Sequence, residues 1–286
     1  MTPAWRKLGI VAGGGELPIA LAEHCAGEGR DFFVARITPF ADPPLVAFPG
    51  ASHALAAIGA RIAALKQAGC DAVTFVGRVP RPDMAHFQID ESGRQYEAAI
   101  REAARRGDDE VLRAVVLAHA QAGFQIVGAE QAMAELLAPA GVWGAVQPSE
   151  LDRADMKQAA TVAATLGRLD IGQGAVVARG LALAVEAQEG TDAMLRRCGE
   201  LPEAIRGTPS ARRGVLVKRP KPMQDRRVDL PTIGMKTIEG AAAAGLAGVA
   251  VEAGGSFAVR RAAIIEAADK AGLFVCGFSR AEVGEP

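Results

Sequence analysis

The chain is poor in the side chains that most often build metal and redox sites. Its 286 residues include four cysteines, four histidines, two tryptophans and one tyrosine. The cysteines lie far apart and form no C-x-x-C pair, which disfavours a zinc site or a redox dithiol and favours free thiols in a reducing compartment. The histidines show no metal-ligand spacing, and no serine or cysteine pattern indicates a nucleophile with a histidine partner.

Long apolar runs and an excess of charge of one sign are also missing. No apolar run approaches the ~20 residues needed to span a bilayer, and the first residues lack the apolar core and cleavage site of a signal peptide. The formal net charge is -1, so no overall field attracts nucleic acid or an anionic membrane. We therefore expect a cytoplasmic protein without a nucleic-acid partner, on which any basic surface is local.

What is present is the composition of a globular α/β protein. Half of the residues are hydrophobic and 23% are charged, and the length allows one large or two ordinary domains. In the N-terminal part, short apolar runs alternate with stretches of helical periodicity, which predicts a parallel sheet with helical crossovers. The strands are predicted at residues 8–12, 32–35, 71–77 and 124–128, and the helices at about 19–26, 60–67, 95–105 and 110–122.

A second domain is predicted after a change of composition near residues 139–144. We expect a Rossmann-like parallel-sheet domain over residues 1–138, a linker over 139–149 and an α/β domain with a mixed sheet over 150–286, with the ligand cleft between the domains. In the second domain an antiparallel strand pair is predicted to turn at Arg179 and Gly180. Further strands are predicted at residues 215–217, 248–251 and 273–276, and helices at about 150–166, 191–198, 235–244 and 261–271.

Three glycines at residues 13–15 follow the first predicted strand and indicate a phosphate site, because glycine backbone N–H groups can approach an anion at the start of the next helix. The alternative is a tight strand–helix turn. Pro18 breaks the G-x-G-x-x-G fingerprint, and Arg36 stands where an acidic residue is expected, which counts against an NAD(P)-dependent oxidoreductase. Gly77 and Arg78 follow another strand, whose end is expected to line the same crevice.

Residues 218–234 form a charge-dense segment, with five cations and two carboxylates after a predicted strand. Prolines prevent a regular helix here. Such a segment suits a phosphorylated ligand and a metal ion, and the alternative is a solvated loop whose charges pair with one another. Lys218, Arg226 and Arg227 flank Asp225, and a carboxylate kept ionised by cations suits a metal ligand or a group that orients water.

A helix is predicted to open at Thr191 and Asp192, directly after Gly190. Either side chain could cap that helix. The functional alternative is that the positive helix end and the Thr191 hydroxyl grip an anion, with Asp192 available to a cation. Gln173, just before the predicted strand pair, offers both a donor and an acceptor to a base or a sugar.

Four motifs together resemble one family. They are G-I-V-A-G-G-G-E-L-P at residues 9–18, D-I-G-Q at 170–173, V-E-A-Q-E-G-T-D at 185–192 and Q-D-R-R-V-D-L-P-T-I-G at 224–234. In these motifs the chain resembles the LpxI-type UDP-2,3-diacylglucosamine pyrophosphatases, in order and from Gly9 to Gly277. The last two motifs are long and specific.

The resemblance implies hydrolysis of UDP-2,3-diacylglucosamine to UMP and 2,3-diacylglucosamine 1-phosphate (lipid X) in the lipid A biosynthesis of Gram-negative bacteria. It also implies dependence on Mg²⁺ and attack of water on the β-phosphorus. Asp225 is carried over as the essential catalytic residue. Asp225 and Asp229 are the expected metal ligands, and structural support of the loop is the alternative role for Asp229. The resemblance and the loop positions together give the expected substrate contacts Gly14, Gly15, Gly77, Arg78, Gln173, Thr191, Asp192 and Lys218.

The expected partners are therefore the UDP-sugar lipid and lipid X. A lipid substrate adds the expectation of at most peripheral contact with the cytoplasmic face of the inner membrane, and we also expect a homodimer. Two other functions compete with this reading: a nucleotide-sugar binding module without catalysis, and the NAD(P)-dependent oxidoreductase already disfavoured by the altered glycine fingerprint.

Overall fold

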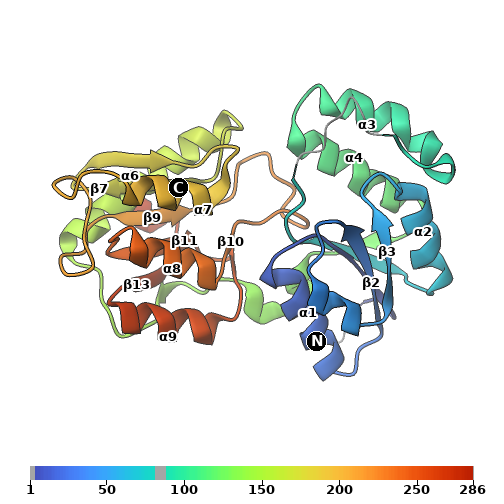
Figure 1. Cartoon of the computed structure of the whole chain (residues 1–286), viewed down its shortest axis with the longest axis horizontal. Helices are drawn as coiled ribbons and strands as arrows, with labels where there is room; N and C mark the ends of the chain where they lie inside the picture. The colour runs from blue at the N-terminus through green and yellow to red at the C-terminus, as the bar shows by residue number, and fades with distance from the viewer. Residues whose placement is uncertain (1–3, 81–87, 286) are drawn as a thin grey trace. The chain divides into compact units, whose positions relative to one another are not determined.

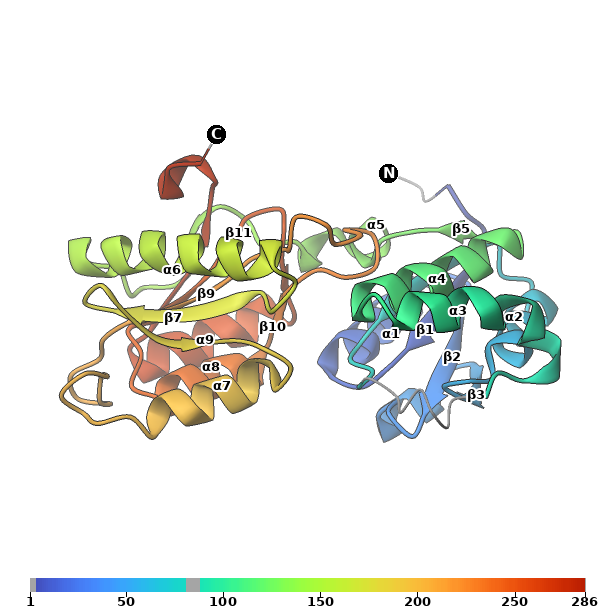
Figure 2. The same cartoon turned by 90° about the horizontal axis from the view of Figure 1, so that it is seen from above.

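The computed structural model describes residues 4–80 and 88–285. The chain forms two compact units, drawn in Figures 1 and 2. Unit 1 consists of residues 1–134 together with the short segment 227–229, and unit 2 consists of residues 135–226 and 230–286. Among the described residues, no helix combines the length and the apolar character that crossing a membrane requires.

Unit 1 is built on a five-stranded sheet in the order β3-β2-β1-β4-β5, with every neighbouring pair parallel. This is the Rossmann-like arrangement that the alternating strands and helices predict. Two of the three inner strands, β1 and β4, are buried along their whole length, as expected for a parallel sheet covered on both faces. The elements are β1 (Leu8–Ala12), α1 (Glu16–Gly27), β2 (Phe32–Thr38), β3 (Gly50–Ala54), α2 (Ile58–Gln67), β4 (Ala72–Val76), α3 (Glu97–Ala104), α4 (Asp108–Gln121), β5 (Gln125–Ile126) and α5 (Ala129–Ala132).

The edge strand β3 is absent from the sequence prediction. Its residues, Gly-Ala-Ser-His-Ala, are small or polar and only partly buried, so they give no apolar alternation. Parallel hydrogen bonding to β2 nevertheless holds this segment in the sheet, with Val34 opposite Gly50. A Cβ atom at position 50 would meet the Val34 carbonyl, so glycine is required for this close approach.

One face of the unit 1 sheet carries a core formed with α2, α3 and α4. Ile58 and Ile62 come from α2, Ile100 from α3 and Val116 from α4. Val228, from the segment 227–229, packs against the same core. The charge-dense loop therefore contributes one apolar side chain to the packing of unit 1.

Unit 2 is built on a six-stranded mixed sheet in the order β6-β13-β11-β9-β7-β8. The three central strands β9, β11 and β13 are parallel, while β6, β7 and β8 pair antiparallel, which confirms the predicted mixed sheet. The elements are β6 (Gly141–Val142), α6 (Glu150–Arg168), β7 (Gly174–Ala178), β8 (Leu181–Val185), α7 (Gly190–Gly199), β9 (Val215–Lys218), β10 (Thr232–Ile233), α8 (Met235–Ala243), β11 (Gly248–Glu252), β12 (Phe257–Ala258), α9 (Arg261–Ala271) and β13 (Phe274–Phe278).

The predicted turn between β7 and β8 is present at Arg179 and Gly180. Both residues have positive φ angles, 50° and 75°, as a two-residue hairpin turn with the twist of the strands requires. The carboxylate of Asp155, from α6, accepts hydrogen bonds from both backbone N–H groups at 2.8 Å. The helix therefore fixes the turn, and the register of the strand pair with it.

Residues 139–149, expected to link the domains, belong to unit 2 in the structure. They include β6, which pairs with the end of β13. Trp143 packs against the unit 2 core and donates its indole N–H to the Pro139 carbonyl at 3.0 Å. The division between the units falls at Glu135.

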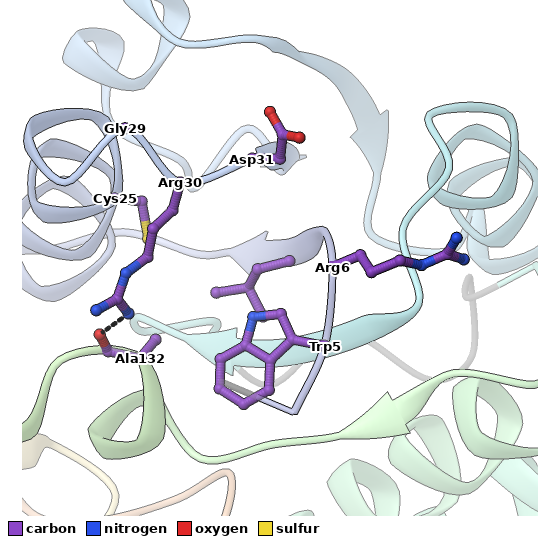
Figure 3. Close-up of a pocket in the computed structure, with 8 residues that line it drawn as sticks. Trp5, Arg6, Cys25, Gly29, Arg30, Asp31 and Ala132 are labelled. Atoms are coloured by element: carbon purple, nitrogen blue, oxygen red, sulfur yellow. Dashed lines mark hydrogen bonds between the residues drawn. The ribbon is translucent and has the colours of Figure 1, made fainter. Parts of the chain in front are cut away.

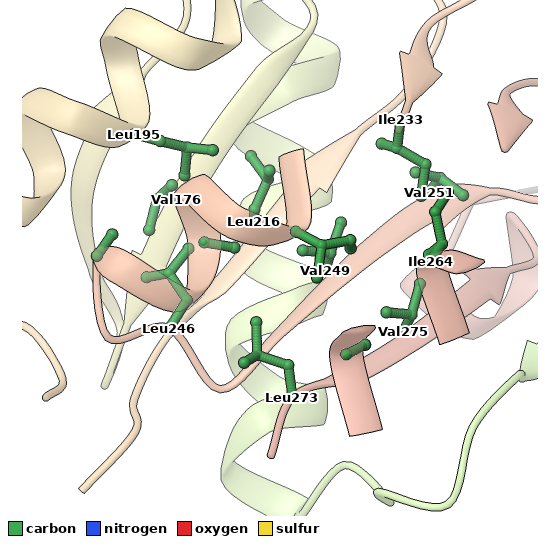
Figure 4. Close-up of a cluster of buried hydrophobic side chains, with 14 of the residues drawn as sticks. Val176, Leu195, Leu216, Ile233, Leu246, Val249, Val251, Ile264, Leu273 and Val275 are labelled. Carbon is green, nitrogen blue, oxygen red and sulfur yellow. The ribbon is translucent and has the colours of Figure 1, made fainter. Parts of the chain in front are cut away.

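Two cores lie on the two faces of the unit 2 sheet, because successive strand side chains point to opposite faces. Leu216 of β9 faces α7, α8 and α9, whereas Val215 and Val217 face α6. Figure 2 shows α6 on one side of this sheet and the other three helices on the opposite side. Figure 4 shows how the side chains of the larger core converge, with Leu246 and Leu273 at one end of it.

We predict that Leu246→Ala lowers the free energy of unfolding by about 2–5 kcal/mol, because this fully buried side chain would leave a cavity. Leu151→Ala is the matched control, since Leu151 is 70% exposed on α6, and we expect a change within about 0.5 kcal/mol. Urea unfolding followed by circular dichroism measures both. Equal effects of the two variants would contradict the assignment of this core.

Candidate active site

The carboxyl ends of the parallel strands in unit 2 gather polar side chains that are far apart in sequence. β9 ends at Lys218, and antiparallel pairing places Gly174, the first residue of β7, opposite it. Gln173 therefore lies at the same edge, where its carbonyl accepts the Arg219 N–H at 3.0 Å. We call this group the carboxyl edge of unit 2 and define it by Gln173, Glu186, Thr191, Lys218 and Thr232.

Lys218 is the central cation of this edge and is only 5% exposed. Its ammonium donates to the Thr191 hydroxyl at 2.7 Å and to the Thr232 carbonyl at 3.3 Å. An ammonium group has three N–H donors, so within the described residues one of them lacks a protein partner. A buried cation with a donor to spare suits an anionic ligand.

Two buried oxygens at the same edge also lack partners. Oε1 of Gln173 and Oε2 of Glu186 make no hydrogen bond within the described part of the chain. Buried polar atoms are nearly always satisfied by protein, water or ligand. The sequence predicts Gln173, Thr191 and Lys218 as substrate contacts, and the structure brings these three together.

Neither Thr191 nor Asp192 caps α7, which corrects the alternative explanation of this motif. The residue before the helix is Glu189, and no side chain caps the first turn. The Thr191 hydroxyl instead donates to Glu186 Oε1 at 3.0 Å and accepts from Lys218. Asp192 is exposed in the first turn of the helix.

Arg219, next to Lys218, serves the fold. Strand alternation continues past β9, so Arg219 points to the α6 side, where it donates to the Ala160 carbonyl at 3.3 Å. Its guanidinium contacts Glu252 at 2.9 Å and Glu285 at 2.6 Å. Burial alone lowers the pKa of Arg219, but the carboxylates of Glu285 and Glu252 outweigh burial and raise that pKa above its usual value. The hydrogen bond with Arg219 in turn lowers the pKa of the Glu285 carboxyl.

The loop that carries Asp225 is anchored on both sides of this half-buried carboxylate. Before it, the Lys221 ammonium pairs with Asp170 at 2.8 Å, and the side-chain oxygen of Gln224 accepts the Lys221 N–H at 3.1 Å. After it, Arg226 donates to the Gly254 carbonyl at 3.0 Å. These cations pair with partners outside the loop, so the loop is not simply a solvated segment with internal salt bridges.

Asp229, the second expected metal ligand, is half-buried and lies in the segment 227–229. Within the described residues, no three acidic, histidine or cysteine side chains come together as a metal site would require. Mg²⁺ is commonly held by one or two carboxylates together with substrate phosphates and water. The metal role of Asp225 and Asp229 stays a prediction.

In unit 1, the glycine loop and the residues after β4 meet as the sequence predicts. Gly14 and Arg78 exchange two backbone hydrogen bonds of 2.9 and 2.8 Å, which join the ends of β1 and β4. Gly77 has a φ of 90°, and a Cβ atom there would lie 2.6 Å from the ring of Pro18. Close packing against Pro18 is therefore enough to explain the glycine at position 77.

The start of α1 is already occupied by a carboxylate. The Gly15 N–H donates to Asp42 Oδ2, which lies after β2. A helix N-terminus attracts anions, and here the protein supplies one. Gly15 itself has open space where a Cβ atom would stand. A phosphate at this position would compete with Asp42.

A cavity of about 290 Å³ in unit 1 lies away from all of these residues. Its wall includes Leu8, the first residue of β1, so it lies at the amino end of the sheet. Figure 3 shows Trp5 and Arg30 on its wall, with Arg30 donating to the Ala132 carbonyl at 2.7 Å. None of the predicted site residues lines this cavity.

We predict that Glu285→Gln lowers the free energy of unfolding at pH 7 by about 1–3 kcal/mol, because Arg219 then keeps only one carboxylate partner. The pKa of Glu285 is lowered in the folded state, so its contribution is complete above the ordinary glutamate value of about 4.3 and is lost as the pH falls through the lowered value.

The measurement is urea unfolding at pH 7 and at pH values below about 4.3, where the difference from wild type should shrink. Glu239→Gln, at an exposed position of α8, is the control and should match wild type throughout. A difference of constant size across this pH range would contradict the assigned role of the carboxylate.

Comparison with known proteins covers both units. Residues 7–136 match the model of the LpxI N-terminal domain, and residues 139–276 match the model of the LpxI C-terminal domain. The chain is also similar to the UDP-2,3-diacylglucosamine pyrophosphatase LpxI of Caulobacter vibrioides. The two are 53% identical over 272 residues, which is 95% of this chain and 97% of the relative.

Proposed function

The chain belongs to the LpxI family of UDP-2,3-diacylglucosamine pyrophosphatases, and on this premise we propose that it hydrolyses UDP-2,3-diacylglucosamine to UMP and 2,3-diacylglucosamine 1-phosphate in lipid A biosynthesis. The observation that carries the proposal is the 53% identity to a pyrophosphatase of this specificity over 95% of the chain. Both units match the family, so neither half is left without a counterpart.

The carboxyl edge of unit 2 is the part of the chain best suited to the diphosphate. Lys218 has an N–H donor to spare, and Thr191 holds the ammonium in place. A cation directed at phosphoryl oxygens stabilises the charge that develops on them during transfer. The unpaired Oε1 of Gln173 is an acceptor for an N–H or O–H of the uridine or the sugar.

Asp225 is the group that we propose orients the attacking water. Its loop is anchored before it through Lys221 and after it through Arg226, which restrains the backbone that carries the carboxylate. Water attacks the β-phosphorus, a bond forms between the water oxygen and that phosphorus, and the bond to the bridging oxygen breaks. UMP leaves with the bridging oxygen, and the water proton passes to the carboxylate or to solvent.

Mg²⁺ is the metal that we propose, with Asp225 and Asp229 as the residues that would hold it alongside the substrate. When bound, it would neutralise the diphosphate oxygens. The proposal follows the family resemblance, and two carboxylates are a donor set that Mg²⁺ accepts when substrate phosphates and water complete its ligands.

We expect Asp225→Asn to lose UMP release by at least about a hundredfold while still binding the UDP-sugar, because the amide cannot accept a proton or hold a divalent ion as the carboxylate does. Mass spectrometry of the products measures turnover, and EDTA should abolish it in the wild type. In H₂¹⁸O the label should enter the sugar phosphate. Label in UMP would overturn the attack on the β-phosphorus.

The same assay separates the competing functions. A nucleotide-sugar binding module would bind the substrate but release no UMP in the wild type. An oxidoreductase is opposed by Arg36, which is 8% exposed and whose guanidinium donates to Ser52 and to the carbonyls of Leu45 and Phe48. That arginine is turned into the protein and is not available to a dinucleotide ribose or its phosphate.

We also propose that unit 2 touches the membrane surface beside the Asp225 loop. Leu169, Ile171 and Met223 are exposed by 66%, 41% and 49%. Lys221 bonds to Asp170, so the two segments that carry these apolar side chains lie side by side. Exposed arginines occur on both segments, at positions 168 and 226, and an apolar patch with cations around it suits an anionic bilayer surface.

The membrane proposal predicts that Leu169→Glu combined with Ile171→Glu weakens flotation with phosphatidylglycerol-containing vesicles by at least about fivefold, because each charge opposes insertion and repels the lipid. Leu151→Glu, at the other end of α6, is the matched control and should float like wild type. The double variant and the control should both keep wild-type activity on substrate that is presented in detergent micelles. Equal flotation of the double variant and the control would refute the docking surface.

A further inference from the structure

Glu186 is buried directly behind the residues expected to bind the substrate. It follows β8, is 6% exposed, and accepts the Thr191 hydroxyl on Oε1 at 3.0 Å. Its other oxygen, Oε2, has no hydrogen-bond partner within the described part of the chain. The sequence gives Glu186 no role of its own, because a single glutamate at the end of a strand is not distinctive.

The three side chains Glu186, Thr191 and Lys218 form a chain of hydrogen bonds, in which Lys218 donates to Thr191 and Thr191 donates to Glu186. An ionised carboxylate can only accept, so Thr191 must direct its single proton toward Glu186. The lone pairs of the hydroxyl are then left for the Lys218 ammonium, which donates at 2.7 Å. A group at position 186 that could also donate would allow the hydroxyl to turn its proton toward Lys218.

The positive charge of Lys218 is compensated through the same chain of hydrogen bonds. A buried ammonium without a counter-ion is costly. Glu186 supplies the negative charge through Thr191, and no direct Glu186–Lys218 ion pair is present among the described residues. The ammonium is thus stabilised without a carboxylate occupying its remaining N–H donor. A direct pair would neutralise the group that has to attract the diphosphate.

The neighbouring backbone is shaped to hold this carboxylate. Gly174, paired with Lys218 across β7 and β9, has no side chain, and a Cβ atom there would collide with Oε2 of Glu186. The Glu186 N–H donates to the Gly174 carbonyl at 2.9 Å, which ties the two residues together. Gly174→Ala would therefore displace the carboxylate without removing it.

We propose that Glu186 is a positioning residue for substrate binding, which fixes the Thr191 hydroxyl and thereby holds the charged Lys218 ammonium toward the diphosphate of the UDP-sugar. The proposal rests on the proposed function, since it assumes a diphosphate at the carboxyl edge. Glu186 itself does not touch the reacting atoms in this proposal.

Steady-state kinetics of Glu186→Gln tests it. The amide keeps the size of the side chain but loses the charge and can donate to Thr191. We expect KM for UDP-2,3-diacylglucosamine to rise by about ten- to a hundredfold, the range for a lost charge-assisted hydrogen bond, with kcat changed by less than about threefold. Glu200→Gln, exposed at the end of α7, is the control and should keep both constants. An unchanged KM in Glu186→Gln overturns the proposal.

A double-mutant cycle distinguishes positioning from a general structural role. Thr191→Val should raise KM as Glu186→Gln does, and Thr191→Ser, which keeps the hydroxyl, should restore it. If Glu186 acts through Thr191, Glu186→Gln adds less than about twofold in the Thr191→Val background. Full additivity of the two changes overturns the proposal, because Glu186 would then act by another route.

Two further measurements keep the outcome interpretable. If thermal unfolding shows that Glu186→Gln does not fold, Gly174→Ala carries the same expectation for KM, and a wild-type KM there is the contradicting result. If the wild type itself releases no UMP, the proposed function fails. Binding of UDP-2,3-diacylglucosamine in the Asp225→Asn background then shows whether Glu186→Gln still weakens affinity; an unchanged affinity overturns the positioning role.

Discussion

Two adjacent cations at the end of β9 are both buried, and the organisation of unit 2 at this edge depends on how their charge is compensated. Strand alternation sends Lys218 and Arg219 to opposite sides of the sheet. Arg219 meets two carboxylates, Glu252 and Glu285, which compensate its charge and make it part of the fold. Lys218 meets a hydroxyl and a carbonyl, which hold the ammonium without neutralising it. The difference in partners separates a structural cation from one that can bind a ligand.

The two units use the carboxyl ends of their strands differently. In unit 1 the backbone donors of the glycine loop are engaged within the protein, at Gly14 by Arg78 and at Gly15 by Asp42. In unit 2 the corresponding edge retains an ammonium donor on Lys218 and an acceptor on Gln173 that the described residues do not satisfy. This difference in hydrogen-bond satisfaction supports the proposal that the diphosphate binds in unit 2, although the glycine motif is the more conspicuous one in the sequence.

Most of the fold could be predicted because most elements bury apolar side chains with a clear period. The β7–β8 hairpin and helices such as α8 and α9 were predicted to within a few residues of their observed bounds. β3 was not, because its small, partly exposed residues carry no period and parallel pairing to β2 alone holds it in place. The predicted site residues Gln173, Thr191 and Lys218 do meet, since strand ends on one edge of a sheet are neighbours. The catalytic and metal roles of Asp225 and Asp229 stay predictions.

The sequence by itself determined the family, the two α/β units and the charge-dense loop, because each of these is written in contiguous motifs or in local periodicity. Only the tertiary structure decided which charges are structural. Glu285 lies 66 residues from Arg219, and Glu186 reaches Lys218 only through Thr191. Partners so distant in sequence leave no local pattern. Whether a charged side chain is paired directly, compensated through a third residue or available to a ligand depends on its burial and on where it points in the folded chain.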